Sequence, residues 1–205
     1  MLEEPLVFNE ERGRRAVDIS ISLLALVIFG PLLALVGLLI RLESPGPVLF
    51  RQKRVGKNEK LFDVYKFRSM TVAQADETRA QEGIDDIEAF QFKPRGQKTA
   101  IGRAIRAASL DELANFLNVL RGDMHIVGPR PDEPEIVAQY RPEWRRRHSV
   151  APGMTGLAQI HVRADLPYAE TMAYDLEYVD RRSLTLDMQI MLKTLGVVAS
   201  REGAR

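Results

Sequence analysis

Residues 19–40 read ISISLLALVIFGPLLALVGLLI and carry no charged side chain. About 20 helical residues cross the roughly 30 Å hydrocarbon core of a bilayer, so this run is long enough for a membrane helix. It is too long for the apolar part of a secretory signal and lacks a small-residue cleavage pattern after it. Core helices of soluble proteins rarely run this far without a polar face, so we predict a membrane helix and keep a buried core helix as the alternative.

Gly30 and Pro31 lie at the midpoint of the run, where a proline removes a backbone donor and predicts a kink. Basic residues stand on both flanks, and Lys and Arg collect on the cytoplasmic side of membrane segments. These residues are Arg12, Arg14 and Arg15 before the run, and Arg41, Arg51, Lys53 and Arg54 after it. The symmetry favours a re-entrant helix that returns to the face it entered, with a spanning helix as the alternative.

The remaining chain is long enough for one soluble domain with its own core. We therefore expect an interfacial lead-in and re-entrant membrane helix over residues 1–42 and a cytoplasmic catalytic domain over residues 43–205. The net charge of +1 gives no case for nucleic acid as a partner. The absence of cysteine excludes disulfides, thiolate nucleophiles and cysteine-based zinc sites, and the three histidines are not spaced like a zinc motif.

Residue patterns predict a mainly helical α+β domain. Strands are expected at 48–54 and 61–67, forming a hairpin, and at 157–162. Helices are expected at 101–107, 110–120, 134–148 with an interruption at Pro142, 168–179 and 184–198. Residues 71–99 are expected to be a solvated excursion, and residues 152–156 a turn. The fold class is thus a kinked membrane helix followed by a compact domain with a short β-hairpin and interfacial amphipathic helices.

Ser109 and Glu112 have the spacing of a capping box, in which each side chain caps a backbone N–H at the start of a helix. The same segment places Asp111 in a first helical turn, where the helix dipole favours a carboxylate and also attracts phosphate. An ionised aspartate is a competent nucleophile for phosphoryl chemistry. The structural and the catalytic interpretation are compatible, and both stay open at this point.

Four basic residues are candidates for phosphate binding: Arg106, Arg130, Lys66 and Arg68. Arginine suits bidentate contact with phosphate oxygens. Arg130 stands between two prolines that restrict its backbone, whereas each of the other three could equally be a solvated surface residue.

Residues 145–148 read RRRH and follow Tyr140 and Trp144. Interleaved basic and aromatic residues suit anionic lipid headgroups, which we prefer here to nucleic acid. A plain solvated helix face is the alternative. Carboxylates for a hard cation such as Mg²⁺ occur at Asp175, Glu177, Asp180 and Asp187, without a spacing that marks one out.

Several short motifs follow Asp18 and the apolar run in a fixed order: SPGPVLFRQ at 44–52, YKFRSM at 65–70, SLDEL at 109–113, NVLRGDM at 118–124, VGPRP at 127–131 and PGMTGLAQ at 152–159. This order closely resembles the bacterial sugar transferases, the monotopic phosphoglycosyl transferases. The resemblance covers residues 12–195.

This resemblance implies transfer of a sugar-1-phosphate from a UDP-sugar to polyprenyl (undecaprenyl) phosphate, with release of UMP, as the first membrane step of glycoconjugate assembly. The family's Asp-Glu dyad falls on Asp111 and Glu112. Asp111 would form a covalent phosphosugar, Glu112 would handle a proton or a metal, and Mg²⁺ would neutralise the diphosphate. Arg106 and Arg130 match family arginines, and Asp187 matches an acidic position that, with Asp111, is a candidate metal ligand.

The resemblance also implies the cytoplasmic face of the bacterial inner membrane, contact with membrane lipid, and no preceding transmembrane helices in this chain. Departures occur at Ala114, His125 and Ala151, where many members have proline, serine and a basic residue. A non-catalytic, membrane-anchored scaffold that binds anionic lipid is the rival hypothesis. The donor sugar and a homo-oligomeric state stay open.

Overall fold

The computed structural model describes residues 4–71, 87–88, 98–161 and 167–200. It is mostly helical, with a long N-terminal helix α1 (Glu4–Glu43) and an antiparallel hairpin of β1 (Leu49–Val55) and β2 (Leu61–Phe67). The hairpin, whose turn contains the short 3-10 helix η1 (Lys57–Glu59), and the predominance of helix confirm the expected mainly helical fold with a long apolar N-terminal helix and a short β-hairpin. Most of the expected excursion at 71–99 lies outside the described residues.

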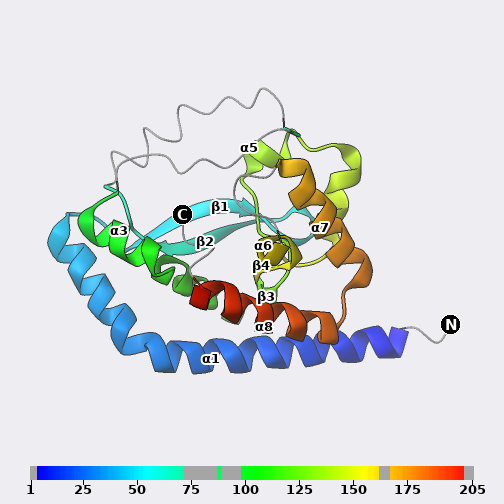
Figure 1. The fold of residues 1–205 in the computed structure, drawn as a ribbon, viewed down its shortest axis with the longest axis horizontal. Helices are drawn as coiled ribbons and strands as arrows, with labels where there is room; N and C mark the ends of the chain where they lie inside the picture. Colours follow the sequence, from blue (N-terminus) through cyan, green and yellow to red (C-terminus); the bar gives the residue numbers. More distant parts are fainter. Residues whose placement is uncertain (1–3, 72–86, 89–97, 162–166, 201–205) are drawn as a thin grey trace.

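Helix α1 is long and apolar enough to cross a membrane by length and composition. It continues through Pro31 without interruption, and Figure 1 shows it running along one side of the molecule and then changing direction. Large apolar side chains along its middle are exposed, with Val27 at 75%. This exposure rules out the buried core helix as an account of the apolar run.

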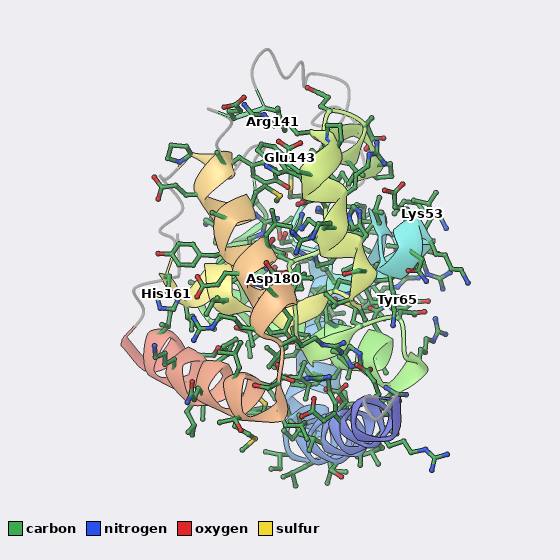
Figure 2. The ribbon with its side chains drawn as sticks, turned by 90° about the vertical axis from the view of Figure 1, so that its right-hand side faces the viewer. Lys53, Tyr65, Arg141, Glu143, His161 and Asp180 are labelled. Atoms are coloured by element: carbon green, nitrogen blue, oxygen red, sulfur yellow. The ribbon has the colours of Figure 1, made fainter. Side chains whose placement is uncertain are left out.

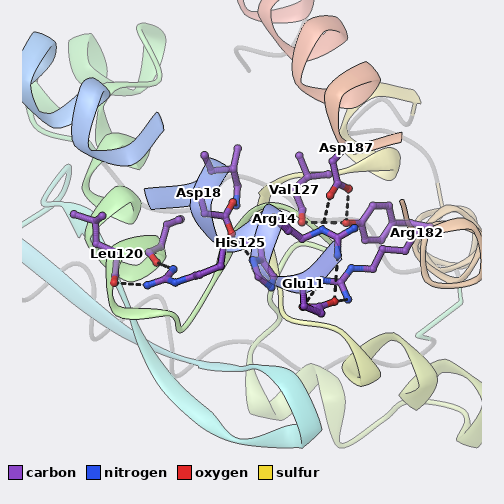
Figure 3. Close-up of polar contacts among 12 residues, drawn as sticks. Glu11, Arg14, Asp18, Leu120, His125, Val127, Arg182 and Asp187 are labelled. Atoms are coloured by element: carbon purple, nitrogen blue, oxygen red, sulfur yellow. Dashed lines mark hydrogen bonds and ion pairs between the residues drawn. The ribbon is translucent and has the colours of Figure 1, made fainter. Parts of the chain in front are cut away.

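The first part of α1 also has a polar stripe, and Figure 3 shows three of its residues, Glu11, Arg14 and Asp18, in contact with side chains from other parts of the protein. Its members follow helical spacing: Glu11, Arg14, Arg15, Asp18 and Ser22. Arg14 Nε donates to Asp187 at 2.5 Å, and Asp18 accepts from the Ile126 N–H at 3.0 Å and contacts His125 Nδ1. The helix is therefore held by buried polar contacts at one end of its apolar run, a feature that the run itself did not reveal.

The other end of α1 packs on the hairpin. Val36 and Ile40 belong to a buried cluster with Tyr65 and Phe67, which alternate with Lys66 on β2 and so share one face of the hairpin. Helix α3 (Ala100–Ala107) joins this cluster through Ile105, and it confirms the expected helix at 101–107. One domain thus holds both ends of α1.

The central core lies between the hairpin and the C-terminal helices α7 (Tyr168–Arg181) and α8 (Leu184–Ser200), both of which the sequence predicted. Figure 1 shows α8 lying alongside α1. Two short parallel strands, β3 (His125–Val127) and β4 (Gly153–Thr155), pair within this core. The turn expected at residues 152–156 contains β4 instead. A strand of three residues is too short to produce an alternating pattern that would predict it.

The other expectations need correction. Residues 157–162 were expected as a strand, but Leu157–His161 form helix α6. The expected helix at 134–148 is a short α5 (Pro134–Val137) and a separate 3-10 helix η3 (Pro142–Ser149), because Pro142 starts a new helix after an extended Arg141. The expected helix at 110–120 begins as a 3-10 helix, η2 (Leu110–Asn115), and becomes α-helical only in α4 (Phe116–Arg121).

Candidate active site

The predicted capping box is wrong. Ser109 adopts a left-handed conformation (φ 53°), and its side chain caps no backbone N–H. The reason is that Ser109 closes the preceding helix α3, donating its own N–H to the Arg106 carbonyl at 3.0 Å, instead of taking the extended conformation of an N-cap residue. Glu112 does not reach back to Ser109 either, so both acidic residues of η2 are available for other roles.

Asp111 is buried at the start of η2. Its nearest charged partner is Arg106, whose Nε lies 3.9 Å from Asp111 Oδ2 and donates at 3.0 Å to the Ser69 hydroxyl instead. Burial raises the pKa of Asp111, and the charge of Glu112 raises it further, against the opposite effect of Lys66 and Arg106. Among the residues that the structure describes, Asp111 is thus a carboxylate surrounded by cations, and no described side chain forms a close ion pair with it.

Glu112, the next residue, has the opposite environment. Its Oε1 accepts from Arg130 Nη2 at 2.5 Å and from Lys66 Nζ at 3.4 Å. Arg130 therefore holds the pKa of Glu112 far below its usual range despite burial. Two adjacent carboxylates with pKa values shifted in opposite directions are typical of sites where they have different chemical roles.

Lys66 points to this site because it alternates with Tyr65 and Phe67 along β2. Burial, with a smaller contribution from the charge of Arg130, lowers the pKa of Lys66 to about 8. Lys66 also lines a shallow hollow together with Arg54, Asn115 and Arg130. Arg54 was not among the predicted site residues. It pairs with Phe62 across the hairpin, and Phe62 lies four residues before Lys66 on β2, so Arg54 and Lys66 share one face of the hairpin.

The loop that carries Arg130 is held by closely packed backbone. The Gly153 N–H donates to the Pro129 carbonyl at 2.9 Å, and the Gly128 N–H donates to Thr155 O at 2.8 Å. A Cβ atom on Gly153 would lie 2.1 Å from Gly128 N, so only glycine fits there. The VGPRP and PGMTG segments therefore form one structural unit.

Behind this loop, Arg147 is buried and donates to the Arg130 carbonyl at 2.7 Å. It also pairs with Asp132 and with Asp175, the latter at 2.5 Å. The third arginine of the RRRH segment is thus part of an internal network that positions the Arg130 loop.

The other two arginines of that segment do not form a free basic patch. Arg145 pairs with Glu59 at 2.8 Å, and Arg146 pairs with Asp180. Figure 2 shows Arg141 and Glu143, near the start of this segment, at the opposite end of the molecule from α1. These contacts show that Arg145 and Arg146 are paired with carboxylates on the protein surface, and the headgroup interpretation of the RRRH segment stays a prediction.

Two candidate residues lie outside the site. Arg68 is buried and donates to the carbonyls of Ile40, Ser44 and Pro45, so it caps the C-terminal end of α1. Asp187 is buried at the start of α8, where it accepts from Arg14 and from the Tyr178 hydroxyl at 2.8 Å. The structure therefore brings together Lys66, Arg106, Asp111, Glu112 and Arg130, and it places Arg68 and Asp187 at contacts of α1.

Within the described ranges, no group of three or more His, Asp or Glu side chains is arranged to hold a metal ion. A closed, all-protein metal cage is therefore absent from that part of the chain. Mg²⁺ does not require one, because it keeps several waters and binds through one or two carboxylates plus substrate phosphates.

Comparison with known proteins gives a consistent result. A relative from Rhizobium leguminosarum, the "Exopolysaccharide production protein PSS", is 42% identical over 193 residues, which are 89% of this chain and 92% of the relative. A "UDP-glucose:undecaprenyl-phosphate glucose-1-phosphate transferase" from Caulobacter vibrioides is 39% identical over 201 residues, covering 93% of this chain and 71% of the relative.

A third relative, from Aeromonas hydrophila, is named "UDP-N-acetylgalactosamine-undecaprenyl-phosphate N-acetylgalactosaminephosphotransferase". It is 38% identical over 200 residues, which are 94% of this chain but 45% of the relative, so the chain spans less than half of that protein. The family model described as "Bacterial sugar transferase" matches residues 9–201 and so includes every site residue described above. The chain belongs to the bacterial sugar transferase family.

Proposed function

We propose that this protein transfers a sugar-1-phosphate from a UDP-sugar to polyprenyl (undecaprenyl) phosphate and releases UMP. The names of two relatives at 38–39% identity describe this type of reaction, with different sugars. Those names support the substrate classes, a UDP-sugar and a polyprenyl phosphate, without selecting the sugar.

The observation that carries the proposal is the unequal pair Asp111 and Glu112. Glu112 is neutralised by Arg130 and Lys66, whereas the one cation of the described residues that pairs with Asp111 is Arg106, at 3.9 Å. A nucleophile must keep an oxygen free to attack, and Asp111 meets that condition better than Glu112. The surrounding cations would attract the donor diphosphate and stabilise charge as the phosphoryl group moves.

In the first proposed step, an Asp111 oxygen attacks the sugar-linked phosphorus, and the bond from that phosphorus to the oxygen of UMP breaks. The product is a phosphosugar on Asp111, and UMP leaves with the bonding electron pair. In the second step, a phosphate oxygen of polyprenyl phosphate attacks the same phosphorus, which releases the Asp111 carboxylate and forms the polyprenyl-diphosphate sugar.

We propose Mg²⁺ as the cofactor, which would neutralise the donor diphosphate. Asp111 fits as a ligand, since no described side chain forms a close ion pair with its carboxylate, and Glu112 lies beside it. Asp187 does not fit, because its two oxygens are engaged by Arg14 and Tyr178. The residues available would thus supply one or two carboxylates, in keeping with Mg²⁺ bound mainly through phosphate and water.

We propose that α1 is re-entrant and that the domain lies on the cytoplasmic face of the bacterial inner membrane. The support is that one domain contacts both ends of the apolar run: Asp18 and Ser22 are buried at one end, and Val36 and Ile40 at the other. A helix that crossed the bilayer would carry its two ends to opposite sides, away from a shared domain.

Helix α8 supports the same placement. Its Met188, Leu192 and Leu195 are exposed at helical spacing, and α8 runs beside α1 in Figure 1. An exposed apolar stripe beside a membrane helix is typical of an element at the lipid interface. α8 would therefore be an interfacial amphipathic helix.

An assay of UMP release tests the proposed reaction. The detergent-solubilised protein is incubated with Mg²⁺, polyprenyl phosphate and a panel of UDP-sugars. We expect UMP with at least one donor from the wild type, none from Asp111→Asn, and wild-type rates from Asp180→Asn, which makes the same change at an exposed ion pair. A normal rate in Asp111→Asn would refute the role of Asp111, and no UMP across the panel would favour the lipid-binding scaffold.

Cysteine labelling tests the topology, since the chain has no cysteine of its own. Glu10 and Lys53 are exposed on either side of the apolar run. Single variants Glu10→Cys and Lys53→Cys should both react with an impermeant reagent only when the cytoplasmic face is accessible. Reaction from opposite faces would mean a spanning helix and would contradict the re-entrant placement.

A further inference from the structure

Most arginines of the described residues are paired with a carboxylate or with backbone carbonyls, but Arg51 and Arg121 differ. Both are exposed, and neither has a carboxylate partner in the parts of the chain that the structure describes. They gather on one aromatic ring instead, with their guanidinium carbons 5.5 Å and 5.0 Å from the ring centre of Tyr65.

Local structure explains how two arginines reach one tyrosine. Arg51 and Tyr65 are directly paired across β1 and β2, which places their side chains on the same face. Arg121 comes from the last turn of α4, and it donates to the Tyr65 hydroxyl. Asn118, fully buried one turn earlier, holds α4 against β2 by accepting from the Tyr65 N–H at 3.1 Å. The two arginines are therefore ordered before any ligand arrives.

This group lies on the face of the hairpin opposite to the active site, because Tyr65 and Lys66 point to opposite sides of β2. It is also close to the start of the apolar run. Arg15 of α1 donates to the carbonyls of Val119 and Leu120 at 2.5 and 2.6 Å, immediately before Arg121. Since Arg15 precedes Ile19 by about one helical turn, the two arginines lie near the level where α1 would enter the membrane.

We propose that Arg51 and Arg121, ordered on Tyr65, form a binding site for the phosphate of an anionic phospholipid headgroup. Two guanidinium groups that no carboxylate of the described residues neutralises suit a phosphate, which each can bind through paired N–H donors. A free carboxylate beside the two arginines would weaken such a site. Asp63 lies on the same face of the hairpin, but its carboxylate is paired with Lys53 at 3.0 Å. The site rests on the proposed membrane placement of α1 but not on the proposed reaction.

Native mass spectrometry of the full-length protein from mixed micelles of phosphatidylglycerol and phosphatidylcholine tests the site without a turnover readout. The wild type should retain phosphatidylglycerol in preference to phosphatidylcholine. Arg51→Gln and Arg121→Gln should each lower this preference about fivefold, the usual effect of one basic residue at an anionic membrane surface. The double variant should lose it. The matched control is Arg145→Gln, an exposed arginine paired with Glu59, which should behave as wild type.

Three results would overturn the proposal. The first is a wild type without preference for phosphatidylglycerol, and the second is a double variant that keeps the preference. The third is displacement of phosphatidylglycerol by added polyprenyl phosphate in the wild type only, which would assign the site to the lipid substrate instead. A wild type that fails to bind phospholipid vesicles at all would refute the membrane placement itself, separately from the reaction.

Discussion

The ion pair between Arg14 and Asp187 predicts that α1 is fastened to the domain by buried charge. Both side chains are 5% exposed, and Arg14 Nε lies 2.5 Å from Asp187 Oδ2. Asp187→Asn would leave the Arg14 cation buried with only Glu11 at 3.2 Å as a counter-ion. Removing one partner of a buried pair costs about 3–5 kcal/mol. We expect about 3 kcal/mol, the low end of that range, because Glu11 remains and asparagine can still accept from Tyr178.

Thermal unfolding in detergent measures this loss, with the fluorescence of the single tryptophan, the buried Trp144, as the signal. For a chain of this size, about 3 kcal/mol corresponds to a drop in Tm of about 6–12 °C. Asp180→Asn, at an ion pair whose side chains are both more than half exposed, should shift Tm very little. A wild-type Tm in Asp187→Asn, together with lost Mg²⁺-dependent activity, would refute the structural role and support the metal-ligand role that the sequence suggested.

Three further predictions concern the site and its supporting network. Gly153→Ala should lower activity and Tm together, because its Cβ would collide with Gly128 N and displace the Arg130 loop; unchanged kinetics would contradict the close packing. Lys66 has its pKa lowered to about 8, so it loses its positive charge as pH rises through that value. At pH values above 8, the KM for the UDP-sugar should therefore increase in the wild type but not in Lys66→Arg, which stays charged. Burial lowers the pKa of His148 to about 4, below the unfolded value of about 6.5, so stability falls as pH drops from 6.5 toward 4. His148→Phe, which retains an aromatic ring against Tyr140, should have a Tm that falls less over that range, and an equal fall would exclude His148 as the cause.

Periodic patterns were sufficient for the long elements. Alternation along β1 and β2, the helical spacing in α7 and α8, and the apolar run of α1 all depend on neighbouring residues, so the sequence reveals them directly. The parallel pairing of β3 with β4 joins residues 125 and 153, and its strands have three residues each. Such short, distant partners leave no local pattern.

The same distinction applies to the site. Asp111 and Glu112 were visible in the sequence because they lie in one short motif, and Arg130 because two prolines flank it. Arg54 was missed because its place depends on which face of the hairpin meets η2. The capping box was wrong because the left-handed conformation of Ser109 depends on how α3 ends, which the Ser-x-x-Glu spacing does not contain.

The roles of Arg68 and Asp187 could not be separated from catalysis by residue type alone. Both are charged residues that the resemblance or their type made candidates, yet one caps α1 and the other pairs with it. The polar stripe of α1 was the available signal: Glu11, Arg14, Asp18 and Ser22 recur at helical spacing before and into the apolar run. Such a stripe predicts that this part of the helix packs against protein.

The covalent phosphosugar on Asp111 is the central claim, and intact-protein mass spectrometry tests it most directly. The protein is mixed with Mg²⁺ and an accepted UDP-sugar in the absence of polyprenyl phosphate and then quenched in acid. We predict a mass increase equal to one phosphosugar, mapped to the peptide that contains Asp111, absent from Asp111→Asn and lost on addition of polyprenyl phosphate. Release of UMP that depends on polyprenyl phosphate, without any adduct on Asp111, would contradict the account.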